Sequence, residues 1–263
     1  MKCIICGSSM AYFFSKRFNL YGLGDVDYWR CEACGFTASR THFEMSDQEW
    51  EELNIEFHND SNQREDNPYN RNQRYFHQAQ MLHLMKRHQI LNPDSWLDWG
   101  CGEGKVSLQL ASNFDVTMAC FDKYITPLSN AVSENEMVMR GHGLVVNTAV
   151  FEHVRDRATL DEIESYVADN GCLAVHTLVR GDIPQDPDWM YLLPVHCAFH
   201  TNQSMQVLMD QWGYHCSVYN EHAKMWVMFR NSVKAIKNRV SSLNALMGWD
   251  YLHFKDGFMD YWP

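Results

Sequence analysis

Short apolar runs in the middle of the chain alternate with glycine turns and with stripes of helical period. Several runs are bounded by Gly, Asn or Asp, which is typical of buried strands. Between the runs, apolar residues recur every three or four positions, as at Leu160, Ile163 and Val167, where Asn170-Gly171 predicts the end of a helix. Strands that alternate with helices predict an α/β fold with a doubly wound, mostly parallel sheet. The runs are residues 96–99, 116–121, 144–146, 172–178, 214–219 and 225–229.

The two ends of the chain follow other patterns. Residues 1–40 contain aromatic, β-prone stretches on either side of a glycine turn. Residues 41–93 predict two helices, the first opening with a capping box at Ser46 and Glu49, and the polar stretch 59–72 predicts a loop between them. After the last pair of strands, one further helix is followed by an irregular aromatic tail.

Four of the 9 cysteines form two pairs of equal spacing near the start of the chain. Two intervening residues allow both sulfurs of a pair to reach one ion at ~2.3 Å, and two pairs complete a tetrahedron. The pattern predicts a structural Zn²⁺ site, closed to substrate and therefore without a catalytic role. Rubredoxin-like iron shares this geometry, and redox dithiols or free thiols are the remaining alternative. The predicted ligands are Cys3, Cys6, Cys31 and Cys34.

A glycine-rich turn, residues 98–104, lies between the first of the central strands and a helix. Glycines at such a place allow a ligand to approach the backbone, and the helix N-terminus offers free N–H groups. Asp122 stands at the end of the next strand, where a carboxylate can accept both hydroxyls of a ribose. Because these two strands are neighbours, the spacing predicts a nucleoside site at the carboxyl edge of the sheet.

The turn resembles motif I of class I S-adenosylmethionine-dependent methyltransferases, in which glycines at alternate positions follow an Asp. Residues 144–154, with a Glu-His-Val after a strand, resemble the fourth-strand segment of that family, and residues 170–173 resemble the turn into its fifth strand. The resemblance covers about residues 95–229. It implies a Rossmann-like sheet and S-adenosyl-L-methionine as cofactor, with the Asp helping to position the methionine amino group. The candidate cofactor-binding residues are Asp98, Gly100, Cys101, Gly102, Asp122, Lys123, Asn147 and Arg74.

Arg74 is a candidate because the polar segment around it can close over the cofactor, where its guanidinium can pair with a carboxylate. One departure from the family pattern concerns the segment between Asp122 and Gly143, which is too short for a full helix and a third strand. Thr126-Pro127 can start only a short helix, and residues 137–139 can form only a stub of strand. The shortening leaves the adenine contact without an assigned residue.

The candidate catalytic residues follow the fourth and fifth strands. His153 comes directly after the fourth strand with Glu152 beside it, and His196 and His200 fall in a predicted loop before a helix. Histidine is the usual general base near neutral pH, and a base is needed if the acceptor is a hydroxyl, an enolisable carbon or a protonated amine. Structural hydrogen bonding is the alternative role for each histidine. We also place His142, less firmly, at this edge.

Composition narrows the function classes. The formal charge is −11, from 22 Lys and Arg against 33 Asp and Glu, which argues against a general nucleic-acid or anionic-membrane binder. No apolar run is long enough to cross a bilayer, and no signal peptide is recognisable, so a cytoplasmic protein is expected. The resemblance to sugar C-methyltransferases and other small-molecule methyltransferases with an N-terminal zinc module implies a small-molecule acceptor, with a sugar or sugar nucleotide as one class.

Two alternatives remain at this point. The chain can be a zinc-ribbon binding protein with a degenerate, non-catalytic methyltransferase-like domain, or an RNA-modifying methyltransferase whose ribbon docks RNA. The domain boundaries expected in every case are residues 1–40 for a zinc ribbon, 41–93 for a helical linker or lid, 94–230 for the cofactor-binding domain, and 231–263 for a C-terminal helix and tail.

Overall fold

The computed structural model describes residues 1–63, 68–91, 94–124 and 131–260. Its centre is a seven-stranded sheet in which the first four strands of the spatial order run parallel and the last three are joined by antiparallel pairing. The strands in spatial order are β5 (Ala119–Phe121), β4 (Trp96–Trp99), β6 (His142–Thr148), β7 (Val167–His176), β11 (Met225–Phe229), β10 (Cys216–Asn220) and β12 (His253–Asp256). The α/β fold with a mostly parallel, doubly wound sheet is therefore confirmed.

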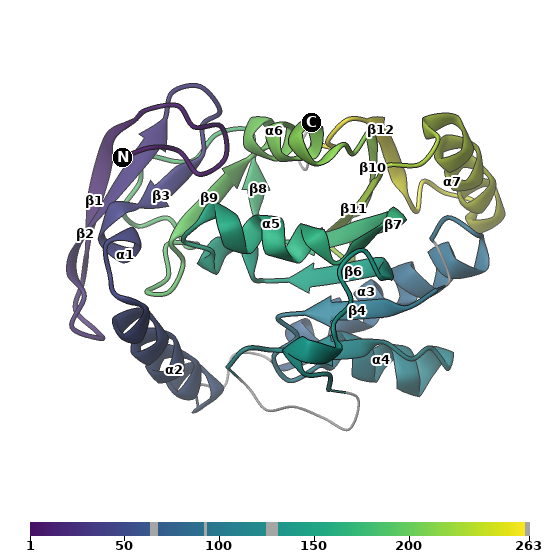
Figure 1. Ribbon diagram of the computed structural model, residues 1–263, viewed down its shortest axis with the longest axis horizontal. Coiled ribbons are helices and arrows are strands. Elements are labelled where there is room, and N and C mark those ends of the chain that lie inside the picture. The colour runs from purple at the N-terminus through teal and green to yellow at the C-terminus, as the bar shows by residue number, and fades with distance from the viewer. Residues whose placement is uncertain (64–67, 92–93, 125–130, 261–263) are drawn as a thin grey trace.

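Helices cover both faces of this sheet (Figure 1). Alternate residues of β6 show the division: Leu144 and Val146 pack with one group of helices, and Val145 packs with the other. On the first face lie α3 (Pro68–Arg87), α4 (Lys105–Phe114) and α7 (Val233–Met247). On the second face lie α5 (Arg157–Ser165) and α6 (Asn202–Trp212).

The N-terminal strands form a second sheet that also contains two strands from the middle of the chain. Its order is β1 (Met10–Phe18), β2 (Gly24–Cys31), β3 (Thr37–Ser39), β9 (Ala198–Thr201) and β8 (Val179–Arg180). The pairing Thr37 with Phe199 joins the ribbon to the segment that leads into α6. Two helices follow β3, α1 (Arg40–Phe43) and α2 (Asp47–Gln63), and α2 lies apart from the sheets in Figure 1.

The structure corrects three boundaries. The predicted 59–72 loop is mostly helical, because α2 runs to Gln63 and α3 begins at Pro68, where proline suits the first turn of a helix. The helix predicted to end at Asn170-Gly171 ends at Ser165 instead, and Val167 already opens β7. Gly171 is required there by packing, since a Cβ would stand 2.8 Å from the His142 carbonyl oxygen. The segment 193–201, predicted as a loop, ends in strand β9.

The segment between β5 and β6 is reduced, as its length suggested. Its described residues contain a short 3₁₀ helix, η1 (Glu134–Glu136), and one parallel bridge between Cys120 and Ala131. Residues 137–139 are not a strand. Thr126-Pro127 lies outside the described residues. Among the helices of the described part of the chain, none is both long enough and apolar enough to cross a membrane.

Candidate functional site

The glycine turn after β4 is held in a conformation that suits glycine. Gly100, Gly102 and Gly104 all have positive φ, of 72°, 54° and 65°. The N–H of Gly100 donates to the Phe121 carbonyl oxygen at 2.8 Å, which ties the turn to the end of β5. A Cβ at Gly100 would stand 2.6 Å from Val150 Cγ2, so the turn also packs closely against the segment after β6.

Asp98 is a buried carboxylate without a hydrogen-bond partner. Its residue is 1% exposed, and neither carboxylate oxygen has a partner among the described residues. Burial raises the pKa of Asp98 well above its ordinary value, and the charges of Cys120 and Asp122 act in the same direction. A buried acceptor of this kind is costly unless a donor, and best a cationic one, reaches it. The site therefore fits a ligand that carries an ammonium group.

Asp122 uses its carboxylate to close the same turn. Oδ2 accepts from the N–H of Gly102 at 2.8 Å, and Oδ1 accepts from the N–H of Tyr124 at 2.9 Å. A carboxylate can accept more than one hydrogen bond on each oxygen, so these two bonds are compatible with a further bond from a ribose hydroxyl. The half-buried Cys101 thiol donates to the Gly102 carbonyl oxygen at 3.5 Å, and Lys123 is exposed beside the turn.

Two more predicted residues lie at this edge of the sheet. Asn147, at the end of β6, donates from Nδ2 to the Trp99 carbonyl oxygen at 3.0 Å, while its Oδ1 is buried without a partner. Arg74 on α3 has a buried Nε without a partner. Its charge is near enough to His176 to help lower the pKa of that imidazole to about 4, a shift caused mainly by burial. Arg74 therefore lies near the carboxyl end of β7.

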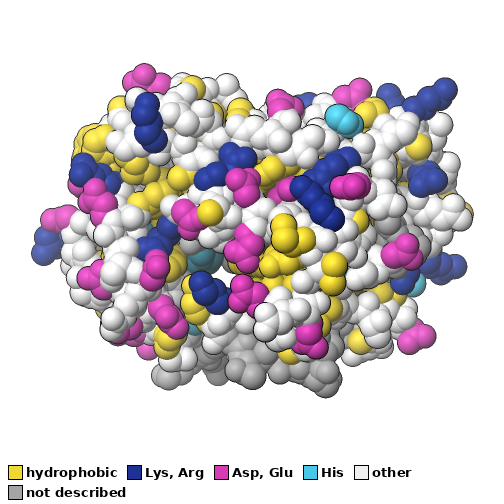
Figure 2. Space-filling view, viewed as in Figure 1, with side chains coloured by type: hydrophobic (Ala, Val, Ile, Leu, Met, Phe, Trp, Pro, Cys, Tyr) yellow, Lys and Arg dark blue, Asp and Glu magenta, His cyan; other side chains and the backbone are white. Residues whose placement is uncertain are grey.

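The structure brings Glu152, His153 and His196 together. The first two belong to a 3₁₀ helix, η2 (Phe151–His153), just after β6, and His196 comes from the segment before β9. One ligand atom from each lies within 4.8 Å of the other two, and the two imidazole centroids are 5.0 Å apart. Figure 2 shows histidine side chains in a hollow on the face in view, in front of the carboxyl ends of β4 and β6 as Figure 1 places them.

Neighbouring groups orient each member of this cluster. The Tyr191 hydroxyl donates to Glu152 Oε1 at 2.7 Å, and the Thr177 hydroxyl donates to Oε2 at 2.8 Å. His196 donates from Nδ1 to the Tyr191 carbonyl oxygen at 2.9 Å, which leaves Nε2 with its lone pair. The ring of His153 has the Val195 backbone as its hydrogen-bond partner, and its Nδ1 is buried without one.

Both imidazoles are neutral at physiological pH. Burial, with a smaller contribution from His196, lowers the pKa of His153 to about 3. Burial also lowers the pKa of His196 to about 4, against the opposing effect of its bond to Tyr191. Burial raises the pKa of Tyr191, so the group that faces Glu152 is a phenol and a donor. The cluster thus presents two imidazole lone pairs and one carboxylate.

Two histidines predicted for this edge lie elsewhere. His200, on β9, is 1% exposed and is enclosed by the rings of Phe36 and Phe151, at centroid distances of 5.1 and 5.6 Å. His142 stands at the amino end of β6, where its Nδ1 is 2.9 Å from the Ser95 hydroxyl oxygen. Because a parallel strand carries its ends to opposite edges of the sheet, His142 is on the side away from the glycine turn.

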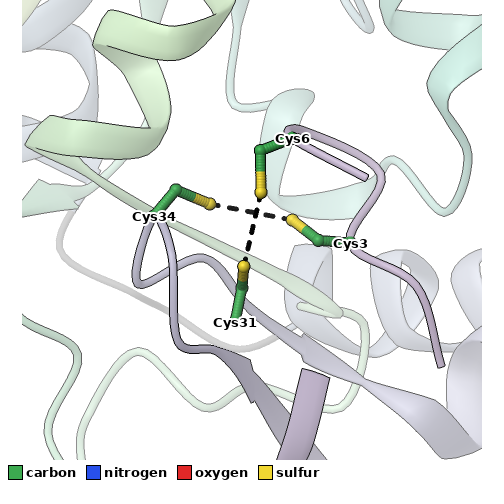
Figure 3. A group of neighbouring side chains, drawn as sticks. All are labelled: Cys3, Cys6, Cys31 and Cys34. Carbon is green, nitrogen blue, oxygen red and sulfur yellow. Dashed lines mark hydrogen bonds between the residues drawn. The ribbon is translucent and has the colours of Figure 1, made fainter. Parts of the chain in front are cut away.

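The four paired cysteines form one cluster (Figure 3). The Sγ atoms of Cys3 and Cys34 are 3.7 Å apart, and those of Cys6 and Cys31 are 3.4 Å apart. A tetrahedral zinc with Zn–S bonds of ~2.3 Å has sulfurs ~3.8 Å apart, so the spacing fits a Zn²⁺ ion. Gly7, after the second cysteine of the first pair, has a φ of 74°.

Hydrogen bonds connect the cysteine-bearing ribbon to β9, α5 and α6. Thr201 donates from its hydroxyl to the Cys34 carbonyl oxygen at 2.5 Å and also caps α6. Arg157 and Gln211, on α5 and α6, donate to the Ile5 carbonyl oxygen at 3.2 and 3.0 Å. The ribbon thereby holds the segment that carries His196, which runs directly into β9.

Sequence reasoning missed Thr177 and the second role of Tyr191. Thr177 follows β7 directly, but a lone Thr after a strand carries no local signal of the carboxylate that it binds. The contact of Tyr191 with Glu152 joins positions 39 residues apart, which spacing along the chain does not reveal.

Comparison with known protein families decides the class of this chain. The model of the methyltransferase domain family matches residues 69–217, which is more than half of the chain. The chain belongs to the methyltransferase domain family. The resemblance carried by the glycine turn and by the Glu-His-Val segment is thus confirmed, and the enzyme class is that of a methyltransferase. A search of curated proteins found no match.

The chain is also similar to several solved structures of methyltransferases. One, a possible histamine N-methyltransferase from Thermotoga maritima, is 12% identical, with 63% of this chain and 96% of that chain covered and a TM-score of 0.42. The plantazolicin methyltransferase BamL, solved with a substrate analogue and S-adenosylhomocysteine, is 14% identical, with 73% and 94% covered and a TM-score of 0.45. Coclaurine N-methyltransferase is 19% identical, with 66% and 61% covered and a TM-score of 0.38.

Proposed function

We propose that this methyltransferase uses S-adenosyl-L-methionine to methylate a small-molecule acceptor bound beside the Glu152 cluster, defined as Glu152, His153 and His196. The observation that carries the proposal is the Asp98 carboxylate, buried without a partner next to a glycine turn that only glycine fits. The methionine part of the cofactor brings an ammonium group, the kind of donor that this carboxylate lacks.

Different residues at this edge of the sheet would bind different parts of the cofactor. Asp98 would hold the ammonium group, and the glycine turn would lie under the methionine and ribose. Asp122 would accept from ribose hydroxyls, and Arg74 would pair with the methionine carboxylate. Asn147 offers a buried unpartnered oxygen at the same edge, while Cys101 and Lys123 flank the turn.

When bound, the cofactor supplies a methyl group on a sulfonium, which is a good electrophile. The chain has to align the acceptor with that methyl group and exclude water. An acceptor that attacks this methyl group would release any proton it carries to an imidazole lone pair of His153 or His196. Both imidazoles are in their neutral, proton-accepting form.

The acceptor class proposed is a small molecule, with a sugar or sugar nucleotide as one candidate. The cluster supports this because it gathers two imidazoles and a carboxylate at one place in the fold. Trp189 is 9% exposed and packs on Phe199 at a centroid distance of 5.4 Å, so it belongs to the hydrophobic core.

The cysteine cluster is proposed to hold one structural Zn²⁺ ion. The sulfur spacing supports it, as do the contacts that tie the ribbon to α5 and α6. We keep the four expected divisions of the chain as a proposal, with the ribbon, residues 1–40, as a scaffold for the segment that carries His196. The catalytic role expected of His200 becomes a packing role in this proposal.

Calorimetry with S-adenosylhomocysteine tests the cofactor. We expect binding of one molecule per chain, and a loss of affinity in Asp122→Ala, with Asp115→Ala, an exposed carboxylate at the end of α4, as the control. Wild-type protein that binds neither S-adenosylmethionine nor its product would support the alternative of a non-catalytic domain on a zinc ribbon. RNA binding in a gel-shift assay would instead favour a nucleic-acid acceptor.

A further inference from the structure

We propose that Glu152, His153 and His196 form a binding site for one first-row divalent metal ion, separate from the cysteine cluster. The proposal deepens the function proposed above, because the ion would sit where the acceptor is expected. It rests on the geometry of the three side chains and of the groups that hydrogen-bond to them. It explains why Glu152 and His196 are held by these hydrogen bonds, which a histidine acting only as a general base would not need.

The donor set is that of a metal site with open positions. Two imidazoles and one carboxylate are the ligands of the facial triad that binds Fe²⁺ and of several catalytic zinc sites. In the structure their ligand atoms lie within 4.8 Å of one another. Ligands at ~2.1 Å from an ion and at ordinary bond angles stand ~3.2 Å apart, so a bound ion would draw the three ligand atoms closer together.

The lone pairs of the imidazoles are left available. His196 donates from Nδ1 to the Tyr191 carbonyl oxygen, 2.9 Å away, and this leaves Nε2 unprotonated. His153 has the Val195 backbone as partner for its ring, while Nδ1 is buried and unpartnered. An imidazole that donates one N–H to a backbone carbonyl and offers the other nitrogen is the usual arrangement of a metal-binding histidine.

The carboxylate is held in the same manner. The hydroxyls of Tyr191 and Thr177 donate to the two oxygens of Glu152, at 2.7 and 2.8 Å, and leave one lone pair on each oxygen. Glu152 is 2% exposed, so its charge is removed from water, and within the described part of the chain no Lys or Arg forms a salt bridge with it. A buried carboxylate without a counter-charge is expensive, and a bound cation offsets that expense.

An ion at this place would change how the acceptor is activated. Three protein ligands leave at least one position for an acceptor oxygen, and a divalent ion lowers the pKa of a hydroxyl that it binds. The proton then leaves to bulk water and not to an imidazole. Methyl transfer to hydroxyl acceptors would become metal-dependent, and a chelating acceptor would bind better than one with a single hydroxyl.

Titration of Co²⁺ into protein whose cysteine cluster is filled with Zn²⁺ tests the site. We expect one further ion per chain and visible d–d absorption without a sulfur-to-cobalt charge-transfer band. His196→Gln and Glu152→Gln should weaken binding at least 100-fold, and Thr177→Val, which removes only an orienting hydroxyl, by ~10-fold. His222→Gln, an exposed histidine away from the cluster, should bind as the wild type does.

Absence of a second ion in the wild type would overturn the proposal, and so would binding that His196→Gln leaves unchanged. A new charge-transfer band would place the ion on cysteine and would overturn it equally. Should Glu152→Gln fail to fold, as judged by circular dichroism, His196→Gln carries the test alone. S-adenosylhomocysteine calorimetry on the same samples separates this outcome from failure of the proposed cofactor, because either ligand can bind without the other.

Discussion

Asp98 offers the sharpest test of the cofactor site, because the same side chain affects ligand affinity and folding stability in opposite directions. In Asp98→Asn the shape is kept and the negative charge is lost. A hydrogen bond to a charged group contributes ~1.5–3 kcal/mol, which corresponds to roughly 10- to 150-fold in Kd. We therefore expect S-adenosylhomocysteine to bind the variant more weakly by that factor in calorimetry.

The stability of the ligand-free protein should change with pH in a defined sense. Burial raises the pKa of Asp98, so the native state binds more protons than the unfolded state above about pH 4. The contribution of Asp98 to the free energy of unfolding therefore falls as pH rises. Asp98→Asn lacks this contribution, and its stability relative to wild type should improve from about pH 5 to about pH 8 in urea unfolding.

The control for both measurements is Asp115→Asn, in which an exposed carboxylate at the end of α4 is replaced by a residue that tolerates its positive φ of 53°. It should bind S-adenosylhomocysteine as the wild type does. An affinity of Asp98→Asn within twofold of wild type would show that the carboxylate does not touch the ligand. A stability difference that is flat with pH would show that the carboxyl group is not buried as described.

Three further predictions follow from other contacts. Gly100→Ala should lose ~1–3 kcal/mol more stability in urea unfolding than Gly213→Ala, because both glycines have positive φ but only at Gly100 would the new Cβ clash with Val150. An equal loss in the two variants, or no relief of the loss in a Val150→Ala background, would contradict this. Cys34→Ser should release the ribbon's zinc and lower Tm by ~10 °C or more, and elemental analysis showing unchanged zinc would refute the site. Burial lowers the pKa of His42 to about 4, so the native state binds fewer protons than the unfolded state below about pH 6.5. The free energy of unfolding should therefore fall as pH drops through that range, and His42→Gln should remove up to ~3 kcal/mol of this fall in acid unfolding. An unchanged slope of stability against pH in the variant would contradict this.

The alternation of strands and helices was readable from the chain because each central strand is a short apolar run. Residues 225–229 form β11 as predicted, and the glycine turn follows β4 as predicted. Boundaries were less predictable where tertiary contacts compete with local pattern. Asn170-Gly171 has the pattern of a helix end, yet Gly171 lies inside β7. Glycine is needed there because the His142 carbonyl oxygen comes too close to leave room for a Cβ.

The candidate site divides in the same way. The glycine turn and the cysteine pairs depend on residues a few positions apart, so spacing predicted a turn after β4 and a cluster of four cysteines. The grouping of His196 with His153 was not visible, because it depends on how β9 pairs with the N-terminal ribbon. Closeness along the chain was misleading for His200, which is only four residues from His196 and yet packs against Phe36 and Phe151, away from the cluster.

The α/β order, the glycine turn and the paired cysteines could be predicted from the chain, because backbone conformation and short-range spacing are local properties. The burial of Glu152 between Tyr191 and Thr177, with two imidazoles beside it, is a result of tertiary structure. Those contacts join segments far apart along the chain, and which side chains are buried and paired depends on how those segments pack.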